Sequence, residues 1–164
     1  MFVPYHTLPT SARIWIYTSS TPLTPEEQAY ISTELQAFCE GWTAHQEPLQ
    51  ASFMLTEGHF VVLAVNEEVC NASGCSIDKS VGIMRKIGEK LQKDFFNRLQ
   101  VGLQLPIGVQ VLSTEQLKTA IANGTVEAST PCFNVAALTK QELLNPYKPL
   151  AETWAKKYLK MVTA

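Results

Sequence analysis

Apolar residues recur along this chain with two different periods, and these periods predict its elements. An alternating pattern or a continuous apolar run predicts strands at residues 12–18, 50–56, 59–66 and 99–105. Apolar stripes with helical spacing predict helices at about residues 25–41 and 77–93. The resulting order, strand–helix–strand–strand–helix–strand, is typical of a split β-α-β, ferredoxin-like core.

Residues with capping chemistry mark where the helices begin. Thr24–Glu27 and Ser113–Gln116 each match a capping box, in which the first and last side chains bond each other's backbone amides. Ser73 or Ser76 caps the second helix, because either hydroxyl can accept a bond from an amide of the first turn. These positions predict three helix starts and support the order above.

The fold class that follows is α+β, in one domain over residues 1–164. The ferredoxin-like core spans about residues 12–112 and ends in an extra hairpin strand at 109–112. The strand at residues 60–65 is apolar on both faces, so both faces of the sheet must be covered. We expect the C-terminal helices, at about residues 113–164, or a second subunit to cover the face that the first two helices leave open.

Composition and charge narrow the classes of partner. Charged residues are 17% of the chain, below the usual share of about 25%, which predicts that a partner or a second copy covers part of the surface. We therefore expect a homodimer or another homo-oligomer. The net charge of −2 and the absence of a basic, glycine-aromatic pattern in the third strand argue against nucleic acid.

The compartment follows from the cysteines and from the lack of targeting segments. None of the four cysteines forms a C-x-x-C pair, no secretory signal opens the chain, and no apolar run reaches membrane-spanning length. We expect a cytoplasmic protein with free thiols and no membrane partner. The histidines and cysteines have no standard zinc spacing, so neither a metal nor a cofactor is expected.

The loop after the third strand is the best candidate site, because small, polar and reactive residues crowd there. Residues 73–80 can be aligned with the phosphate-loop pattern G-x-x-x-x-G-K-[ST] and match its Lys79-Ser80 end. Both defining glycines are missing, because Ser73 and Asp78 occupy their positions. The protein is therefore not expected to be a phosphate-loop ATPase.

Two hypotheses for this loop remain open. The first is a non-catalytic module for a small polar or anionic ligand, or for a protein. Its candidate ligand-binding residues are Asn66, Glu67, Ser73, Gly74, Ser76, Lys79 and Trp42. The second is an enzyme in which Cys75, at a helix N-terminus that lowers thiol pKa values, acts as nucleophile with His45 or Asp78. Against both stands the simpler interpretation that the serines only cap the helix and that Cys75 is structural.

Several segments resemble a family of small uncharacterised bacterial proteins. They are Arg13–Tyr17, Trp42–His45, Phe60–Val65, Ala72–Asp78, Phe95–Leu99 and Pro131–Asn134, which together span most of the chain. Members of that family often carry the label "ABC transporter ATPase", but the family implies no established activity. The label does not suit this sequence, which lacks the phosphate-loop glycines and the LSGGQ signature.

Overall fold

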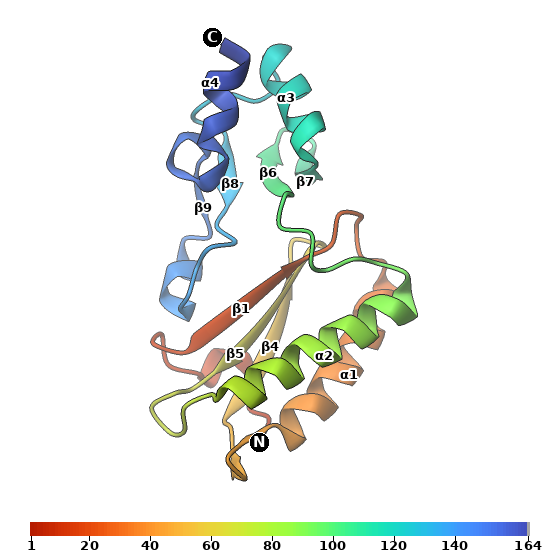
Figure 1. Cartoon of the computed structure of the whole chain (residues 1–164), viewed down its shortest axis with the longest axis vertical. Coiled ribbons are helices and arrows are strands. Elements are labelled where there is room, and N and C mark those ends of the chain that lie inside the picture. The colour runs from red at the N-terminus through yellow and green to blue at the C-terminus, as the bar shows by residue number, and fades with distance from the viewer. Residues whose placement is uncertain (164) are drawn as a thin grey trace. The chain divides into compact units, whose positions relative to one another are not determined.

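A computed structural model describes residues 1–163 and has a mixed α+β fold (Figure 1). Its strands are β1 (Arg13–Thr18), β2 (Thr43–Ala44), β3 (Glu47–Pro48), β4 (Ala51–Thr56), β5 (Phe60–Val65), β6 (Val101–Leu105), β7 (Gly108–Leu112), β8 (Pro131–Phe133) and β9 (Tyr147–Pro149). Its α-helices are α1 (Pro25–Gly41), α2 (Gly74–Leu91), α3 (Thr114–Ala122) and α4 (Lys157–Thr163). Short 3-10 helices connect several of these elements.

The chain divides into two compact units. Unit 1 comprises Met1–Phe96 and Ala136–Leu144, and unit 2 comprises Asn97–Val135 and the chain from Asn145 onward. The sequence predicted a single domain with a helical extension beginning near residue 113. In the structure β6 and β7 instead group with the C-terminal part of the chain, so the division falls after residue 96.

Unit 1 is built on a three-stranded sheet in the order β1-β5-β4, with antiparallel neighbours. β1 and β4 therefore run parallel, with β5 between them, which is a split β-α-β arrangement. β5 is buried along its whole length, as its apolar run predicted. The predicted fourth strand lies in a separate sheet of unit 2, so the complete ferredoxin-like sheet is not confirmed.

Helices α1 and α2 lie side by side on one face of this sheet (Figure 1). The core beneath them includes Ile31 and Leu35 of α1 and Met84 of α2, packed with Leu63 of β5. Trp15 of β1 also faces this core, where its ring lies 6.0 Å from that of Trp42. The helices thus cover the face of β1 that carries Trp15.

The opposite face of the sheet is covered by two segments that are far apart in sequence. Leu8 of the N-terminal segment and Ala137 pack there against Ile14 and Val62. Lys140 links the two segments, because its ammonium group donates hydrogen bonds to three carbonyls of the N-terminal segment, those of Tyr5, His6 and Leu8. The expectation that the C-terminal helices cover this face holds only for the segment Ala136–Leu144, which ends in a short 3-10 helix. Helices α3 and α4 belong to unit 2.

Both edges of the unit 1 sheet are partly paired by neighbouring chain. On β1, the amide of Ile14 donates to the carbonyl of Leu138 over 3.0 Å. On β4, the amide of Val3 donates to the carbonyl of Ala51 over 2.9 Å. These bonds cover one end of each edge strand.

Unit 2 contains a four-stranded sheet in the order β7-β6-β8-β9, with all neighbours antiparallel. Its core joins Val101 and Leu103 of β6 to Leu117 of α3 and Tyr158 of α4. The predicted hairpin between residues 99–105 and 109–112 is confirmed as β6 and β7. Two short 3-10 helices, Leu150–Glu152 and Trp154–Lys156, precede α4.

The helix starts agree with the capping chemistry read from the sequence. Thr24 and Ser113 both form the predicted capping boxes with residues three positions later. In α2 the cap is Ser73, so the helix begins at Gly74, earlier than predicted. Gly88 is needed near the other end of α2, because a side chain there would meet the backbone carbonyl of Lys93 at 2.6 Å.

Candidate functional site

The loop that leads into α2 uses its polar side chains to hold its own shape. The Asn66 side chain donates to Gln50 over 2.6 Å and accepts from the amide of Glu68. Glu67 accepts a hydrogen bond from the amide of Ala72, and its carboxylate lies 3.8 Å from Arg13. Asn66 and Glu67, two of the candidate ligand-binding residues, are therefore already engaged within the protein.

The two serines at the start of α2 are also engaged. Ser73 and Ser76 form a reciprocal capping box, in which each hydroxyl accepts from the other residue's amide. Ser76 is fully buried, and its carbonyl accepts a 2.8 Å hydrogen bond from the indole nitrogen of Trp42. Trp42 is therefore a packing residue that anchors the first turn of α2, in which Gly74 and Cys75 are exposed.

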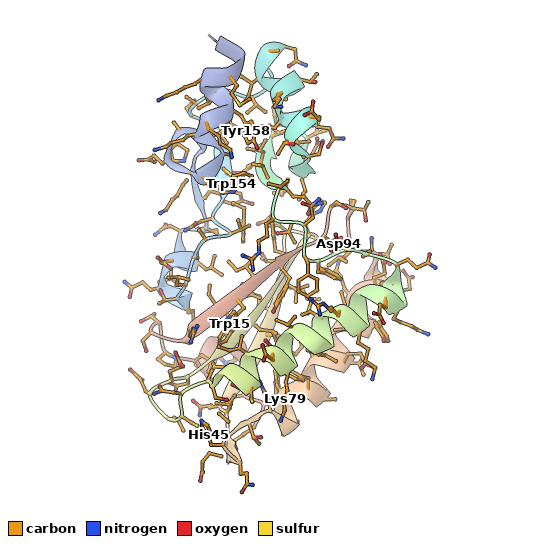
Figure 2. The ribbon with its side chains drawn as sticks, viewed as in Figure 1. Trp15, His45, Lys79, Asp94, Trp154 and Tyr158 are labelled. Atoms are coloured by element: carbon orange, nitrogen blue, oxygen red, sulfur yellow. The ribbon has the colours of Figure 1, made fainter. Side chains whose placement is uncertain are left out.

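The candidate catalytic residues lie in two places, the β2–β3 turn and α2, and all are exposed. His45 is in the turn between β2 and β3, where it and Gln46 both have positive φ angles. Cys75 and Asp78 are exposed on α2, as is Lys79, and Figure 2 labels His45 and Lys79. No hydrogen bond or ion pair joins Cys75, His45 and Asp78 within residues 1–163, so no activating base is in place for the thiol.

The four thiols fall into two classes. Cys39 and Cys132 are buried, and burial raises the pKa of the Cys39 thiol to about 12 and that of Cys132 to about 11. Cys75 is exposed and Cys70 is half-buried. The buried pair is therefore chemically inert at neutral pH, and any thiol chemistry rests on the other two.

Two open grooves are lined by residues outside this loop. One, of about 560 Å³, follows the C-terminal end of α2 and is lined by Arg85, Gly88, Lys93 and Phe96 among others. Lys93 is already paired there with Glu27 at 3.6 Å, and the Arg85 guanidinium lies 5.4 Å from the centre of the Phe96 ring. The charged groups of this groove are thus largely satisfied within unit 1.

The second groove, of about 400 Å³, lies in unit 2 between β7 and α3. We call it the β7–α3 groove, and it is lined by Leu105, Gln110, Leu112, Glu115, Gln116, Thr119, Ala120, Asn123 and Thr125. The sequence reasoning missed it, because the groove exists only once α3 folds back over the hairpin. The sequence feature that could have indicated this groove was the uncharged β7 strand followed by a helix with polar residues on one side.

Searches for related proteins and for ion sites add no candidate ligand. No protein-family model, curated protein or solved structure matches this chain. Within the described part of the chain, no three His, Cys, Asp or Glu side chains gather so that they could hold a metal ion. Among residues 1–163, no helix has the length and apolar character needed to cross a membrane.

Proposed function

We propose that this protein is a non-catalytic interaction module and that its binding surface is the β7–α3 groove. The observation that carries the proposal is a groove with an apolar floor beside the outermost strand of a sheet. Leu105, Leu112 and Ala120 supply partly buried apolar surface there. Such a combination suits a protein segment better than a small charged ligand.

The polar residues of the groove support the same class of partner. Gln110 offers an amide donor and acceptor beside the apolar floor. Gln116, Thr119 and Asn123 are bonded to Ser113, Glu115 and Thr125 respectively, and offer only their remaining polar groups. Glu115 is the one charged residue among those that line it, and it already bonds Lys118 over 3.2 Å. A ligand held mainly by charge would find no concentrated charge in this groove.

The loop at residues 66–80 is a weaker site for the same function. Its carboxylate, amide and hydroxyl groups bond one another, so a small anion would have to compete with the existing bonds of Glu67, Ser73 and Ser76. The second hypothesis, a Cys75-dependent enzyme, is supported only by an exposed thiol in the first turn of a helix. A Cys75→Ser protein should keep its fold and its binding, whereas a thiol enzyme would lose turnover.

Three further proposals concern identity and setting. The four free thiols support a reducing, cytoplasmic location. The arrangement β1-α1-β4-β5-α2 supports kinship with the first part of a ferredoxin-like fold. Membership in the small bacterial family that the sequence resembles is proposed on the segments quoted above.

The test of the interaction proposal is a peptide selection on the immobilised full chain. A displayed library of random 12-residue peptides is enriched, and the affinity of synthetic winners is measured by fluorescence anisotropy. The Thr119→Arg variant places a long cation in the groove, whereas Ala122→Arg adds the same side chain at an exposed α3 position that does not line it. We expect at least tenfold weaker binding for Thr119→Arg and unchanged binding for Ala122→Arg.

Two results would contradict the interaction proposal. One is a selection that enriches no peptide above an immobilised unrelated protein. The other is a set of peptides that bind wild type and Thr119→Arg equally well, because such peptides would recognise another surface.

A further inference from the structure

We infer that the occupant of the β7–α3 groove is an extended segment of another protein, which pairs with β7 as a fifth strand of the unit 2 sheet. This inference rests on the proposed function and specifies how the partner is held. It follows from the hydrogen-bonding direction of β7, from the contrast with the other sheet edges, and from the side chains beside the strand.

The register of the β6–β7 hairpin shows which backbone groups of β7 point away from the sheet. Leu105 pairs with Gly108 across the two-residue turn at residues 106–107, and the pairing continues without a bulge to Leu112. In a two-residue hairpin the residues that flank the turn exchange both backbone bonds, and such pairs then alternate along the ladder. Gly108, Gln110 and Leu112 therefore bond β6.

Val109 and Val111 consequently direct their amides and carbonyls outward. β7 is the last strand on this side of the sheet, so no strand of unit 2 within the described residues meets them. The adjoining turn is also exposed, since Ile107 keeps 83% of its surface accessible. Unpaired donors and acceptors along such an edge form a template for another extended chain.

The other edges of the two main sheets are protected in ways that β7 is not. β9, at the far edge of the same sheet, carries the charged Lys148 and ends at Pro149, which has no amide hydrogen to donate. In unit 1, β1 and β4 are partly paired by neighbouring segments. β7 has the sequence Gly-Val-Gln-Val-Leu, with neither a charge nor a proline to discourage strand pairing.

The side chains beside β7 define the pattern that the partner should carry. Successive side chains of an added strand point to opposite faces, so every second one faces α3 and the groove. The apolar floor of Leu105, Leu112 and Ala120 lies on that face. The partner is therefore an extended segment with uncharged apolar residues at alternate positions.

A second copy of this chain fits the edge less well. Two β7 strands paired antiparallel around a twofold axis at Gln110 would place Gly108 of one copy opposite Leu112 of the other. Glycine has no side chain to cover that leucine, so the apolar floor would stay exposed. The observations therefore favour a different protein with larger side chains at those positions.

The experiment scans the backbone of a selected peptide with N-methyl groups, one residue at a time. An N-methyl group removes one amide hydrogen and leaves the side chain unchanged. Because only alternate amides of an added strand face β7, we expect binding to weaken at least tenfold at every second position and little between them. A helical occupant would instead show losses with a spacing of three to four residues, which would overturn the inference.

Protein variants supply the second arm. Val111→Pro removes an outward amide hydrogen without touching a bond to β6, and Val111→Thr keeps that amide with a similar shape. We expect at least tenfold weaker binding for the proline variant and near-normal binding for the threonine variant. If Val111→Pro fails to fold, which its circular dichroism spectrum would reveal, the N-methyl scan alone decides.

The possible failures are distinguishable. Peptides that bind Thr119→Arg weakly but show no alternating losses in the N-methyl scan would overturn strand addition and leave the interaction proposal standing. Peptides that bind Val111→Pro as tightly as wild type would have the same meaning. A wild-type dimer that dissociates in Val111→Pro and competes with the peptide in sedimentation experiments would assign the edge to a second copy. A selection that yields no peptide overturns both.

Discussion

Raising the pH should weaken unit 1 through the buried thiol of Cys39. This side chain is fully buried on α1, and burial raises its pKa from the ordinary 9.0 to about 12. In the unfolded chain the thiol ionises near its ordinary pKa, but in the folded protein it stays neutral. The stabilisation is complete below pH 9 and is lost as the pH rises toward 12.

The size of the effect follows from the separation of the two pKa values. One pKa unit corresponds to about 1.4 kcal/mol, so ionisation in the unfolded state lowers the free energy of unfolding by about 1.4 kcal/mol at pH 10. At pH 11 the loss attributable to Cys39 reaches about 2.7 kcal/mol. This change is large against typical domain stabilities of about 5–15 kcal/mol.

The assay compares wild type with Cys39→Ala by urea unfolding at several pH values between 8 and 11. A Trp154→Phe background restricts tryptophan fluorescence to Trp15 and Trp42, both of which lie in unit 1. The alanine variant is less stable at every pH because of the cavity, so the informative quantity is how the difference between the two proteins changes with pH. Lysine and tyrosine titrations are common to both proteins and cancel.

We expect the stability advantage of wild type over Cys39→Ala to shrink by about 2.7 kcal/mol between pH 8 and pH 11. Cys132→Ala, in the other unit, should leave this pH dependence of unit 1 unchanged. Parallel curves for wild type and Cys39→Ala would refute the reasoning, because they would mean that the thiol ionises equally easily in the folded and unfolded states.

Three other predictions test the packing that supports the two faces of unit 1. Gly88→Ala should lower the free energy of unfolding, measured in urea, by about 1–3 kcal/mol, because the new methyl group meets the backbone carbonyl of Lys93. Gly82→Ala, in open space on the same helix, should be neutral or stabilising by up to about 1 kcal/mol. Equal effects of the two substitutions would contradict the close approach of Gly88 to Lys93. Trp42→Phe should lower the free energy of unfolding by about 1–3 kcal/mol, because the hydrogen bond to the Ser76 carbonyl is lost, and should speed amide exchange at the start of α2. An unchanged urea midpoint would argue against that bond. Lys140→Met should lower the free energy of unfolding by about 1–2 kcal/mol and speed amide exchange on the outer edge of β1. Amide protection equal to that of wild type would show that the lysine does not hold the segment Ala136–Leu144 in place.

Local chemistry was readable from the sequence, whereas the grouping of strands into sheets was not. The capping residues Thr24 and Ser113 act within four residues of themselves, so their roles follow from spacing alone. For α2 the sequence left Ser73 and Ser76 as alternatives, and the structure has Ser73 as the cap. The apolar run of β5 likewise predicted a buried central strand. The sheet that β6 joins depends on its pairing with β8, about thirty residues later in the chain. Hydrophobic periodicity carries no information about such pairing partners.

The candidate loop illustrates the same limit. Sequence reasoning grouped Asn66, Glu67, Ser73 and Ser76 in one polar loop, but it could not tell whether their polar groups face a ligand or one another. That distinction depends on bonds to distant residues, such as those from Asn66 to Gln50 and from Trp42 to Ser76. Composition shows where polar groups gather along the chain, and only the fold shows which of them remain available to bind a ligand.

The return segment at Ala136–Leu144 makes the order of synthesis matter for folding. A ribosome releases the strands and helices of unit 1 long before it reaches Lys140, whose ammonium group bonds carbonyls more than 130 residues earlier. During that interval one face of the nascent sheet and an edge of β1 lack their cover, which is the condition that favours aggregation or chaperone capture. Emergence of residues 136–144 from the ribosome, rather than formation of the first sheet, should therefore set when unit 1 becomes resistant to proteases.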